Sequence, residues 1–290
     1  MSTTYTKGLD IFNSSNCSAT EFIIWGFSDT PRLQPVLFLI FLLIYALTVF
    51  GNIVIITVIF WDNRLQKPMY CFLCNMSFLD FSYSTVTAPY MLYVLITGHK
   101  KLSIKRCMTQ LYFFNSFASV EYLLLTTMAY DRYMAICKPF LYNQVMSPKV
   151  CFWLSLTAWI SGFIAALPVT ILSSALTFCV VLLFSCFLLT VMSYVYIISA
   201  IFKIQSTEGR HKAFSTCGSH LTVVTLFYIL VVGVYMKPTS SYSLDVGKML
   251  SVLYVNVIPM LNPFIYSLRN KDVKDAVIKL GKDRLHKNRF

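Results

Sequence analysis

The chain has 290 residues, of which 57% are hydrophobic and 12% are charged, and its formal net charge is +12 at pH 7. A soluble domain usually carries about 25% charged residues, so this composition excludes an ordinary soluble globular protein and favours one that is embedded in lipid. The positive charge could indicate nucleic-acid binding, but the basic residues fall mostly in short segments between apolar runs and in the tail, so we expect no nucleic-acid partner. The nine cysteines show no CxxC pair and no Cys/His ligand spacing, which argues against a zinc site.

Residues 1–35 precede the first apolar run and are predicted to form an extracellular segment. Residues 1–20 are polar and lack the apolar core of a cleavable signal peptide. Two glycosylation acceptor patterns, Asn13-Ser14-Ser15 and Asn16-Cys17-Ser18, occur there. We therefore expect Asn13 and Asn16 to be glycosylated on the outer side. The alternative is that both are unmodified residues of a polar tail.

Seven apolar stretches follow, each long enough for a bilayer, which takes about 20 residues. They are residues 36–60, 69–93, 107–130, 151–171, 176–202, 214–236 and 248–267. Open strands cannot span lipid, so each stretch is predicted to be a helix. The predicted fold is an all-α membrane protein, in which one domain over residues 1–290 forms a bundle of seven transmembrane helices.

The distribution of lysine and arginine predicts the orientation of this bundle. If the N-terminus is outside, the inner loops and the tail hold 16 of the 24 basic residues. This bias predicts an extracellular N-terminus and a cytoplasmic C-terminus in a multi-pass plasma-membrane protein. The first outer loop opposes the bias, because it carries Lys100, Lys101, Lys105 and Arg106.

Residues 268–290 are predicted to form a cytoplasmic tail that contains a short amphipathic helix. Val273, Ala276, Val277 and Leu280 recur at helical spacing with lysines between them. Such a helix would lie on the inner membrane surface, where lipid is its partner. The alternative is an unstructured basic tail.

Two acids lie deep within predicted spans. Asp80 and Glu121 lie 12 and 11 residues from the inner ends of the second and third spans. At 1.5 Å per residue both are about 16–18 Å above the inner boundary and therefore share a layer. A lone charge there costs roughly 2.5–3.5 kcal/mol, so a proton or a cation should accompany the pair. We expect a sodium ion, helped by Asn52 and Asn262, and no other cofactor; the alternative is protonated acids that only form hydrogen bonds.

The seventh span contains Asn262-Pro263 and, one turn further on, Tyr266. Pro263 removes a backbone hydrogen bond, while Asn262 and Tyr266 supply polar groups that can change partners. This arrangement favours a segment with two alternative conformations.

The string MAYDRYMAIC, residues 128–137, closes the third span with Asp131-Arg132-Tyr133. It resembles the inner end of the third helix of rhodopsin-like G-protein-coupled receptors, and of the olfactory receptor family in particular. Further strings resemble that family in the same order along the chain. They are LQKPMY at 65–70, NMSFLD at 75–80, KAFSTCGSHLTVV at 212–224 and PMLNPFIYSLRN at 259–270.

The resemblance implies a function as an odorant receptor. It would bind a small volatile and activate a heterotrimeric G protein of the stimulatory olfactory type, which raises cyclic AMP. The switch residues would be those that rearrange when the inner end of the sixth span moves outward. They are Asp131, Arg132, Tyr133, Tyr194, Tyr228, Asn262, Pro263 and Tyr266.

A ligand is expected in the outer half of the bundle. The residues that face inward there, by helical phase and by resemblance, are Phe114, Asn115, Ala118, Ser119, Tyr122, Val231, Val232, Tyr235, Val252 and Val255. Most are apolar and none is charged, which predicts a small, neutral, mostly apolar ligand. Receptors for amines resemble this chain except that an aspartate stands where Phe114 is. The alternative is that some of these residues only pack helices together.

The chain departs from the resemblance at its second outer loop. Only 24 residues separate Pro168 from Ser193, so the long loop of the family is shortened here. Cys107 resembles the cysteine that pairs with that loop, and Cys179 is the nearest remaining candidate for a disulfide with it. A receptor-like protein that misfolds or does not signal is therefore an alternative.

Two further classes of function fit the sequence less well. A transporter or channel could use Asp80 and Glu121 as a relay, but no internal repeat accompanies them. An enzyme is not predicted, because no acid is placed to form a triad with Ser219 and His220.

Overall fold

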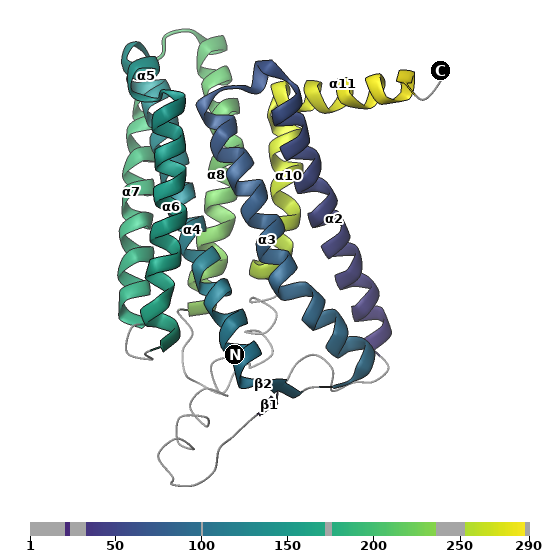
Figure 1. The fold of residues 1–290 in the computed structure, drawn as a ribbon. Coiled ribbons are helices and arrows are strands. Elements are labelled where there is room, and N and C mark those ends of the chain that lie inside the picture. Colours follow the sequence, from purple (N-terminus) through teal and green to yellow (C-terminus); the bar gives the residue numbers. More distant parts are fainter. Residues whose placement is uncertain (1–20, 24–32, 100, 172–175, 236–252, 288–290) are drawn as a thin grey trace.

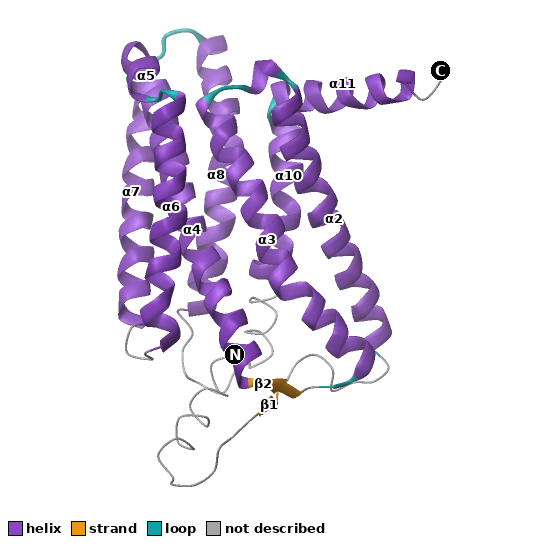
Figure 2. Cartoon of the chain, in the orientation of Figure 1, coloured by secondary structure: helices purple, strands orange, loops and turns teal. Residues whose placement is uncertain are grey.

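The structure is a computed structural model that describes residues 21–23, 33–99, 101–171, 176–235 and 253–287. It is a bundle of long helices with a two-stranded ribbon at one end and a helix lying across the other (Figures 1 and 2). We call the end with the ribbon the outer end and the end with α5 and α11 the inner end, after the predicted orientation. Asn13, Asn16 and Val252 lie outside the described residues.

The described elements have the following bounds, in chain order. They are β1 (Glu21–Ile23), α2 (Gln34–Trp61), the short helix η2 (Asn63–Leu65), α3 (Pro68–Thr97), β2 (Lys101–Ser103), α4 (Ile104–Cys137), α5 (Pro139–Val145), α6 (Pro148–Ile171), α7 (Leu176–Phe202), α8 (Thr207–Tyr235), the π-helix η4 (Leu253–Val257), α10 (Ile258–Arg269) and α11 (Lys271–Lys287).

Each of the seven predicted spans contains a helix, which confirms the predicted helical bundle. The fifth span coincides with α7, and the fourth begins earlier because proline at 148 starts α6. Proline suits a helix start, where its missing N–H would have no helical partner anyway. The seventh span is described from residue 253, and residues 248–252 lie outside the described part.

Only some of the described helices are apolar enough to cross a membrane by length and hydropathy alone. They are Gln34–Trp61, Pro148–Ile171 and the part Leu183–Phe202 of α7. Helices α3 and α4 are less apolar because they bury polar side chains inside the bundle, among them Ser84, Ser116 and Ser119. Polar groups that face the bundle interior avoid contact with lipid.

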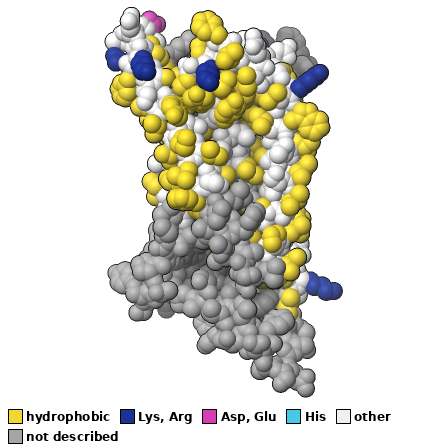
Figure 3. All heavy atoms as spheres, turned by 90° about the vertical axis from the view of Figure 1, so that its left-hand side faces the viewer, with side chains coloured by type: hydrophobic (Ala, Val, Ile, Leu, Met, Phe, Trp, Pro, Cys, Tyr) yellow, Lys and Arg dark blue, Asp and Glu magenta, His cyan; other side chains and the backbone are white. Residues whose placement is uncertain are grey.

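The lateral surface of the bundle, along the sides of the helices, is apolar. Figure 3 shows the side of α6 and α7, where hydrophobic side chains cover the described surface along the bundle and basic side chains are few, most of them at the inner end. Ile160 and Ile164 of α6 are exposed, as are Leu189 and Val195 of α7. Exposed apolar side chains on this scale indicate a surface that faces lipid.

Strands β1 and β2 and the short helix α5 were not predicted from the sequence. Strands β1 and β2 pair antiparallel at the outer end, with Phe22 opposite Leu102. Between α3 and this ribbon, Gly98 adopts φ 67°, a left-handed conformation that glycine allows at a helix end. Helix α5 fills the inner loop between α4 and α6.

The predicted amphipathic helix of the tail is present as α11. It lies across the inner end of the bundle (Figure 1), with Val273 and Ala276 fully buried against it. Lys274 and Lys279 are exposed. Asn270 is the one residue between α10 and α11, so the connection between the two helices is as short as it can be without merging them.

Candidate functional site

A buried polar contact joins α3 to α10 in the middle of the bundle. Asp80 is 2% exposed, and Nδ2 of Asn262 donates a hydrogen bond to its Oδ2 at 2.8 Å. Nearby in α2, Nδ2 of Asn52 donates to the carbonyl oxygens of Thr48 at 2.9 Å and Pro259 at 3.2 Å. The buried Oδ1 of Asn52 has no hydrogen-bond partner within the described part of the chain. An unsatisfied buried oxygen of this kind suits a water molecule or a cation.

Glu121 is the second buried acid, in α4. Tyr83 of α3 contacts Phe117 of α4, with ring centroids 6.1 Å apart. Asp80 lies one turn inward from Tyr83, and Glu121 lies one turn inward from Phe117, so the two acids occupy the same level. Both are buried, and Glu121 also interacts electrostatically with Tyr228 of α8. The oxygen atoms that this level offers to a cation are the carboxylates of Asp80 and Glu121, and Asn52 adds its unsatisfied Oδ1. Among the described residues, no group of three or more histidine, cysteine or acidic residues is arranged so that it could hold a metal ion.

At the inner end of α4, Arg132 forms an ion pair with its neighbour Asp131. Both are buried, at 7% and 1% exposure. The hydroxyl of Tyr142, in α5, donates to Oδ1 of Asp131 at 2.8 Å. A buried charge needs such partners, so α5 supports the pair that the sequence placed on α4 alone. Tyr133 lies outside this pair and contacts the rings of Tyr130 and Tyr196.

Facing this ion pair, α7 and α8 contribute a second buried polar contact. The hydroxyl of Tyr194 forms a short hydrogen bond with Nδ1 of His220. His220 is 3% exposed, and its Nε2 has no hydrogen-bond partner among the residues described. Tyr194 packs with Ala129 and Cys217, so the tyrosine links α4, α7 and α8.

The predicted ligand-contacting residues of α4 form part of a packed layer in the outer half. The ring of Phe114 lies 5.3 Å from that of Tyr83, and Tyr122 contacts Phe227 of α8 at the same distance. Asn115 is half-buried. The remaining described members of the predicted set are buried, namely Ala118, Ser119, Val231 and Val255.

Several predicted residues cannot be placed in these contacts. The side chains of Val232, Tyr235, Tyr266 and Cys179 lie outside the described part. Cys107 is half-buried at the outer start of α4, and its pairing with Cys179 stays a prediction because the side chain of Cys179 lies outside the described part. Pro263 is buried, and a Cβ placed on Gly51 would lie 3.1 Å from its Cβ, which brings α2 and α10 into close contact.

Sequence reasoning missed three partners that the structure supplies. They are Tyr142 beside Asp131, His220 beside Tyr194, and Trp159, whose Nε1 donates to Oδ1 of Asn75 at 3.1 Å. A polar partner for His220 could have been predicted from the sequence, because a histidine in a membrane span is rare and usually makes a polar contact inside the bundle. No such prediction was possible for Tyr142, because its partner lies in another element.

Two family models match the chain. The one described as "7 transmembrane receptor (rhodopsin family)" matches residues 51–186, and the one described as "Olfactory receptor" matches residues 177–284. Both models describe receptors and not enzymes, and together they match residues 51–284.

Among curated proteins, the chain is similar to olfactory receptor 5AR1 of Mus musculus, with 45% identity over 295 positions, 90% of this chain and 95% of that receptor. It is 44% identical to olfactory receptor 5AP2 of Mus musculus, over 94% of this chain and 97% of that receptor. It is 43% identical to olfactory receptor 5AR1 of Homo sapiens, over 94% of this chain and 98% of that receptor.

These alignments also show that residues are missing. The first extends over 295 positions but includes 90% of a 290-residue chain, or 261 residues, so about 34 positions of the relative have no counterpart here. In the structure, only residues 172–175 separate α6 from α7, at the loop where the sequence predicts the shortfall. With these matches over nearly its full length, the chain belongs to the olfactory receptor family of seven-transmembrane, rhodopsin-type receptors.

Proposed function

We propose that this receptor binds a small, neutral, mostly apolar volatile in the outer half of the bundle and activates a heterotrimeric G protein of the stimulatory olfactory type. The observation that carries the proposal is the buried Asp131–Arg132 pair, held by Tyr142. In the proposed mechanism, the receptor is inactive while Arg132 is paired with Asp131. A signal requires that it exchange this partner for another.

The contacts around Tyr194 support the second half of the switch. In the proposed mechanism, the ligand draws the outer ends of α7 and α8 inward, and the inner end of α8 moves outward. This movement separates His220 from Tyr194, so that Tyr194 can turn towards Arg132. The ligand shifts this equilibrium only by its difference in affinity for the two states.

The inner surface offers features that suit a G protein. Phe140 of α5 is 95% exposed, which is unusual for an aromatic side chain and suits insertion into an apolar pocket of a partner. Lys138, Lys203 and Arg210 lie at the same end, where basic side chains suit acidic lipid head groups or an acidic partner surface. This assignment places the N-terminus outside the cell and the C-terminus in the cytoplasm.

A direct test expresses the epitope-tagged receptor with a cyclic-AMP reporter and applies neutral, amine and acid volatiles of similar size. We expect responses to neutral compounds only, with half-maximal concentrations at about micromolar or above, because a ligand of some ten heavy atoms rarely binds more tightly. Surface staining of the chain, and of a variant with a family-length loop inserted between α6 and α7, distinguishes this proposal from its alternative. Intracellular retention of the natural chain and a response only from the loop-restored variant would favour the misfolded protein.

We also propose that a sodium ion binds beside Asp80, which predicts that ligand-independent signalling depends on the cation in the medium. Replacing sodium by potassium at constant ionic strength should raise ligand-independent signalling in the natural receptor, since a bound cation beside Asp80 favours the resting state. Asp80→Asn should show the same signalling in both salts, because the amide cannot neutralise the ion. Equal sodium dependence in the two proteins would show that sodium acts elsewhere than at Asp80.

A further inference from the structure

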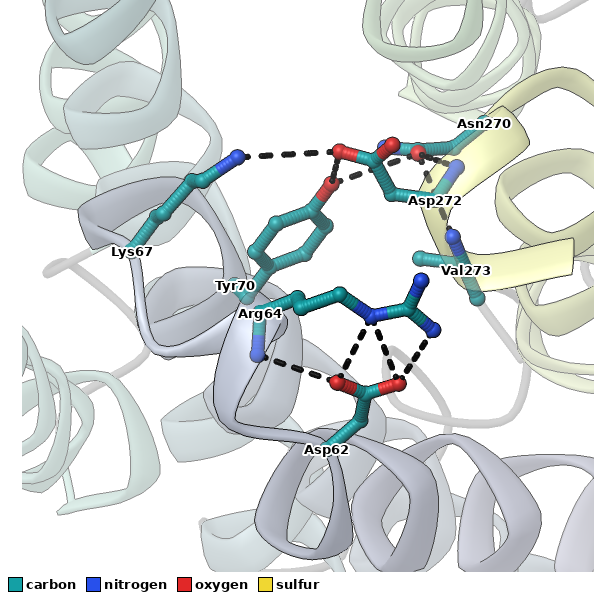
Figure 4. A network of polar contacts seen from close by, with 7 residues as sticks. All are labelled: Asp62, Arg64, Lys67, Tyr70, Asn270, Asp272 and Val273. Carbon is teal, nitrogen blue, oxygen red and sulfur yellow. Dashed lines mark hydrogen bonds and ion pairs between the residues drawn. The ribbon is translucent and has the colours of Figure 1, made fainter. Parts of the chain in front are cut away.

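A polar junction connects the first inner loop to the start of α11 (Figure 4). The side chains of Lys67 and Tyr70, from α3 and the residue before it, point towards Asn270 and Asp272 at the start of α11. A cavity of 330 Å³ lies at this junction, lined by Arg64, Lys67, Asp272 and Asp275.

Tyr70 makes the central contact of the junction. Its side chain is buried, and its hydroxyl donates to Oδ2 of Asp272 at 3.0 Å and lies 3.3 Å from Oδ1 of Asn270. Oδ1 of Asn270 also accepts from the backbone N–H groups of Asp272 at 3.1 Å and Val273 at 3.4 Å. Asn270 thus caps α11, and one phenol on α3 contacts both this cap and the first acid of the helix.

The charges around Tyr70 do not make this cavity an anion site. Arg64 is bound to Asp62 at 2.6 Å, and this contact lowers the pKa of Asp62 to about 2. Lys67 lies 3.7 Å from Asp272, and both side chains are more than half exposed. An exposed pair at this distance contributes little, whereas a hydrogen bond to a carboxylate from a buried hydroxyl is among the stronger kinds. The hydroxyl of Tyr70 is therefore the principal polar contact that holds α11.

The junction also restrains α10. Asn270 alone separates the end of α10 from the start of α11, and Val273 and Ala276 are fully buried beneath α11. An inward or rotational movement of the inner end of α10 must therefore carry α11 with it or break its contact with α3.

We propose that Tyr70 is a positioning residue that latches α11 to α3 and thereby holds the inner end of α10 in its resting position. The link to signalling rests on the proposed function, whereas the latch itself is a property of the fold. Both can be measured in the same variants.

The test compares Tyr70→Phe with Tyr90→Phe by hydrogen exchange and by cyclic-AMP output. Tyr90 is a matched control because it lies on the same helix at the outer end, where its hydroxyl donates to the carbonyl oxygen of Lys101 at 3.4 Å. In Tyr70→Phe we expect the backbone amides of residues 273–282 to exchange about tenfold faster, as local opening of α11 becomes easier. Ligand-independent cyclic AMP should rise about threefold at equal surface protein. Tyr90→Phe should change neither quantity.

Variants of Asp272 separate the hydrogen bond from general damage to the tail. Asp272→Asn keeps an oxygen that can accept from Tyr70 but loses the charge that strengthens the bond, so its exchange should fall between that of the natural protein and that of Tyr70→Phe, whereas Asp272→Ala should approach Tyr70→Phe. Unchanged exchange of α11 in Tyr70→Phe would overturn the latch. Faster exchange without a rise in ligand-independent output would overturn its coupling to α10. If the natural receptor raises no cyclic AMP with any volatile, the proposed function fails, yet the exchange measurement still decides whether the latch exists.

Discussion

Replacing Gly162 with alanine should separate α4 from α6 and remove most of the receptor from the cell surface. A Cβ at this position would lie 2.4 Å from Cγ2 of Val120 and 2.8 Å from its backbone nitrogen. A valine side chain could turn away, but the backbone of α4 cannot, so the two helices would have to move apart. Overpacking of this kind costs about 3 kcal/mol, a large fraction of the few kcal/mol by which a folded protein is stable. Surface staining and the thermal stability of the purified receptor measure the loss.

Two further variants establish the cause of this loss. Gly281→Ala makes the same chemical change in α11, where a Cβ meets nothing within 4 Å, and should leave surface protein unchanged. Val120→Ala combined with Gly162→Ala removes the nearest methyl group but leaves the contact with the backbone, so it should restore stability only in part. Full surface expression of the single Gly162→Ala variant would mean that α4 and α6 are not packed this closely.

The long helices could be predicted because the thickness of the bilayer fixes their length. The predicted fifth span, residues 176–202, coincides with the helix Leu176–Phe202. Spans four and six begin several residues earlier in the structure, where polar or basic residues continue the helix beyond its apolar part. The hydrophobic pattern reports where a chain enters lipid, whereas the helix ends where its backbone finds a cap.

The short elements could not be predicted, because contacts with distant segments decide them. Strand β2 has three residues and exists only through its pairing with β1, about 80 positions earlier in the chain. Helix α5 has seven residues, too few to be stable alone, and its Tyr142 is bound to Asp131 of α4. Nothing within either segment reveals these partners.

For the site, sequence reasoning identified buried polar residues better than their partners. Burial of Asp80 could be inferred because an acid in an apolar span has to face the bundle interior, and Asn262 follows from the same argument. The partner of Tyr194 depends on how α7 and α8 are rotated, which hydropathy does not specify. Small residues at every fourth position of α6, Ala158, Gly162 and Ala166, did carry an unused signal of close helix packing.

Removing the charge of Arg132 should abolish signalling at comparable surface expression. In Arg132→Ala the inner end of α8 can still move outward. However, the variant lacks the guanidinium group that would leave Asp131 and bind a new partner. We expect cyclic-AMP output at background for every ligand, normalised to surface protein. The buried Asp131 keeps the hydroxyl of Tyr142 as a partner at 2.8 Å, which limits the loss of folded protein that an isolated buried charge would cause.

The complementary variant determines whether the ion pair itself holds the resting state. Asp131→Asn keeps an oxygen that can accept from Tyr142 but removes the charge that holds Arg132, so ligand-independent output should rise while surface protein is preserved. An ion pair with both partners buried resists separation far more than one at the surface, so releasing it should increase basal signalling several-fold. If Arg132→Ala gave full output, Arg132 would not be part of the switch. Silence of Asp131→Asn would instead mean that the pair supports the active state, and the direction of the proposed exchange would be reversed.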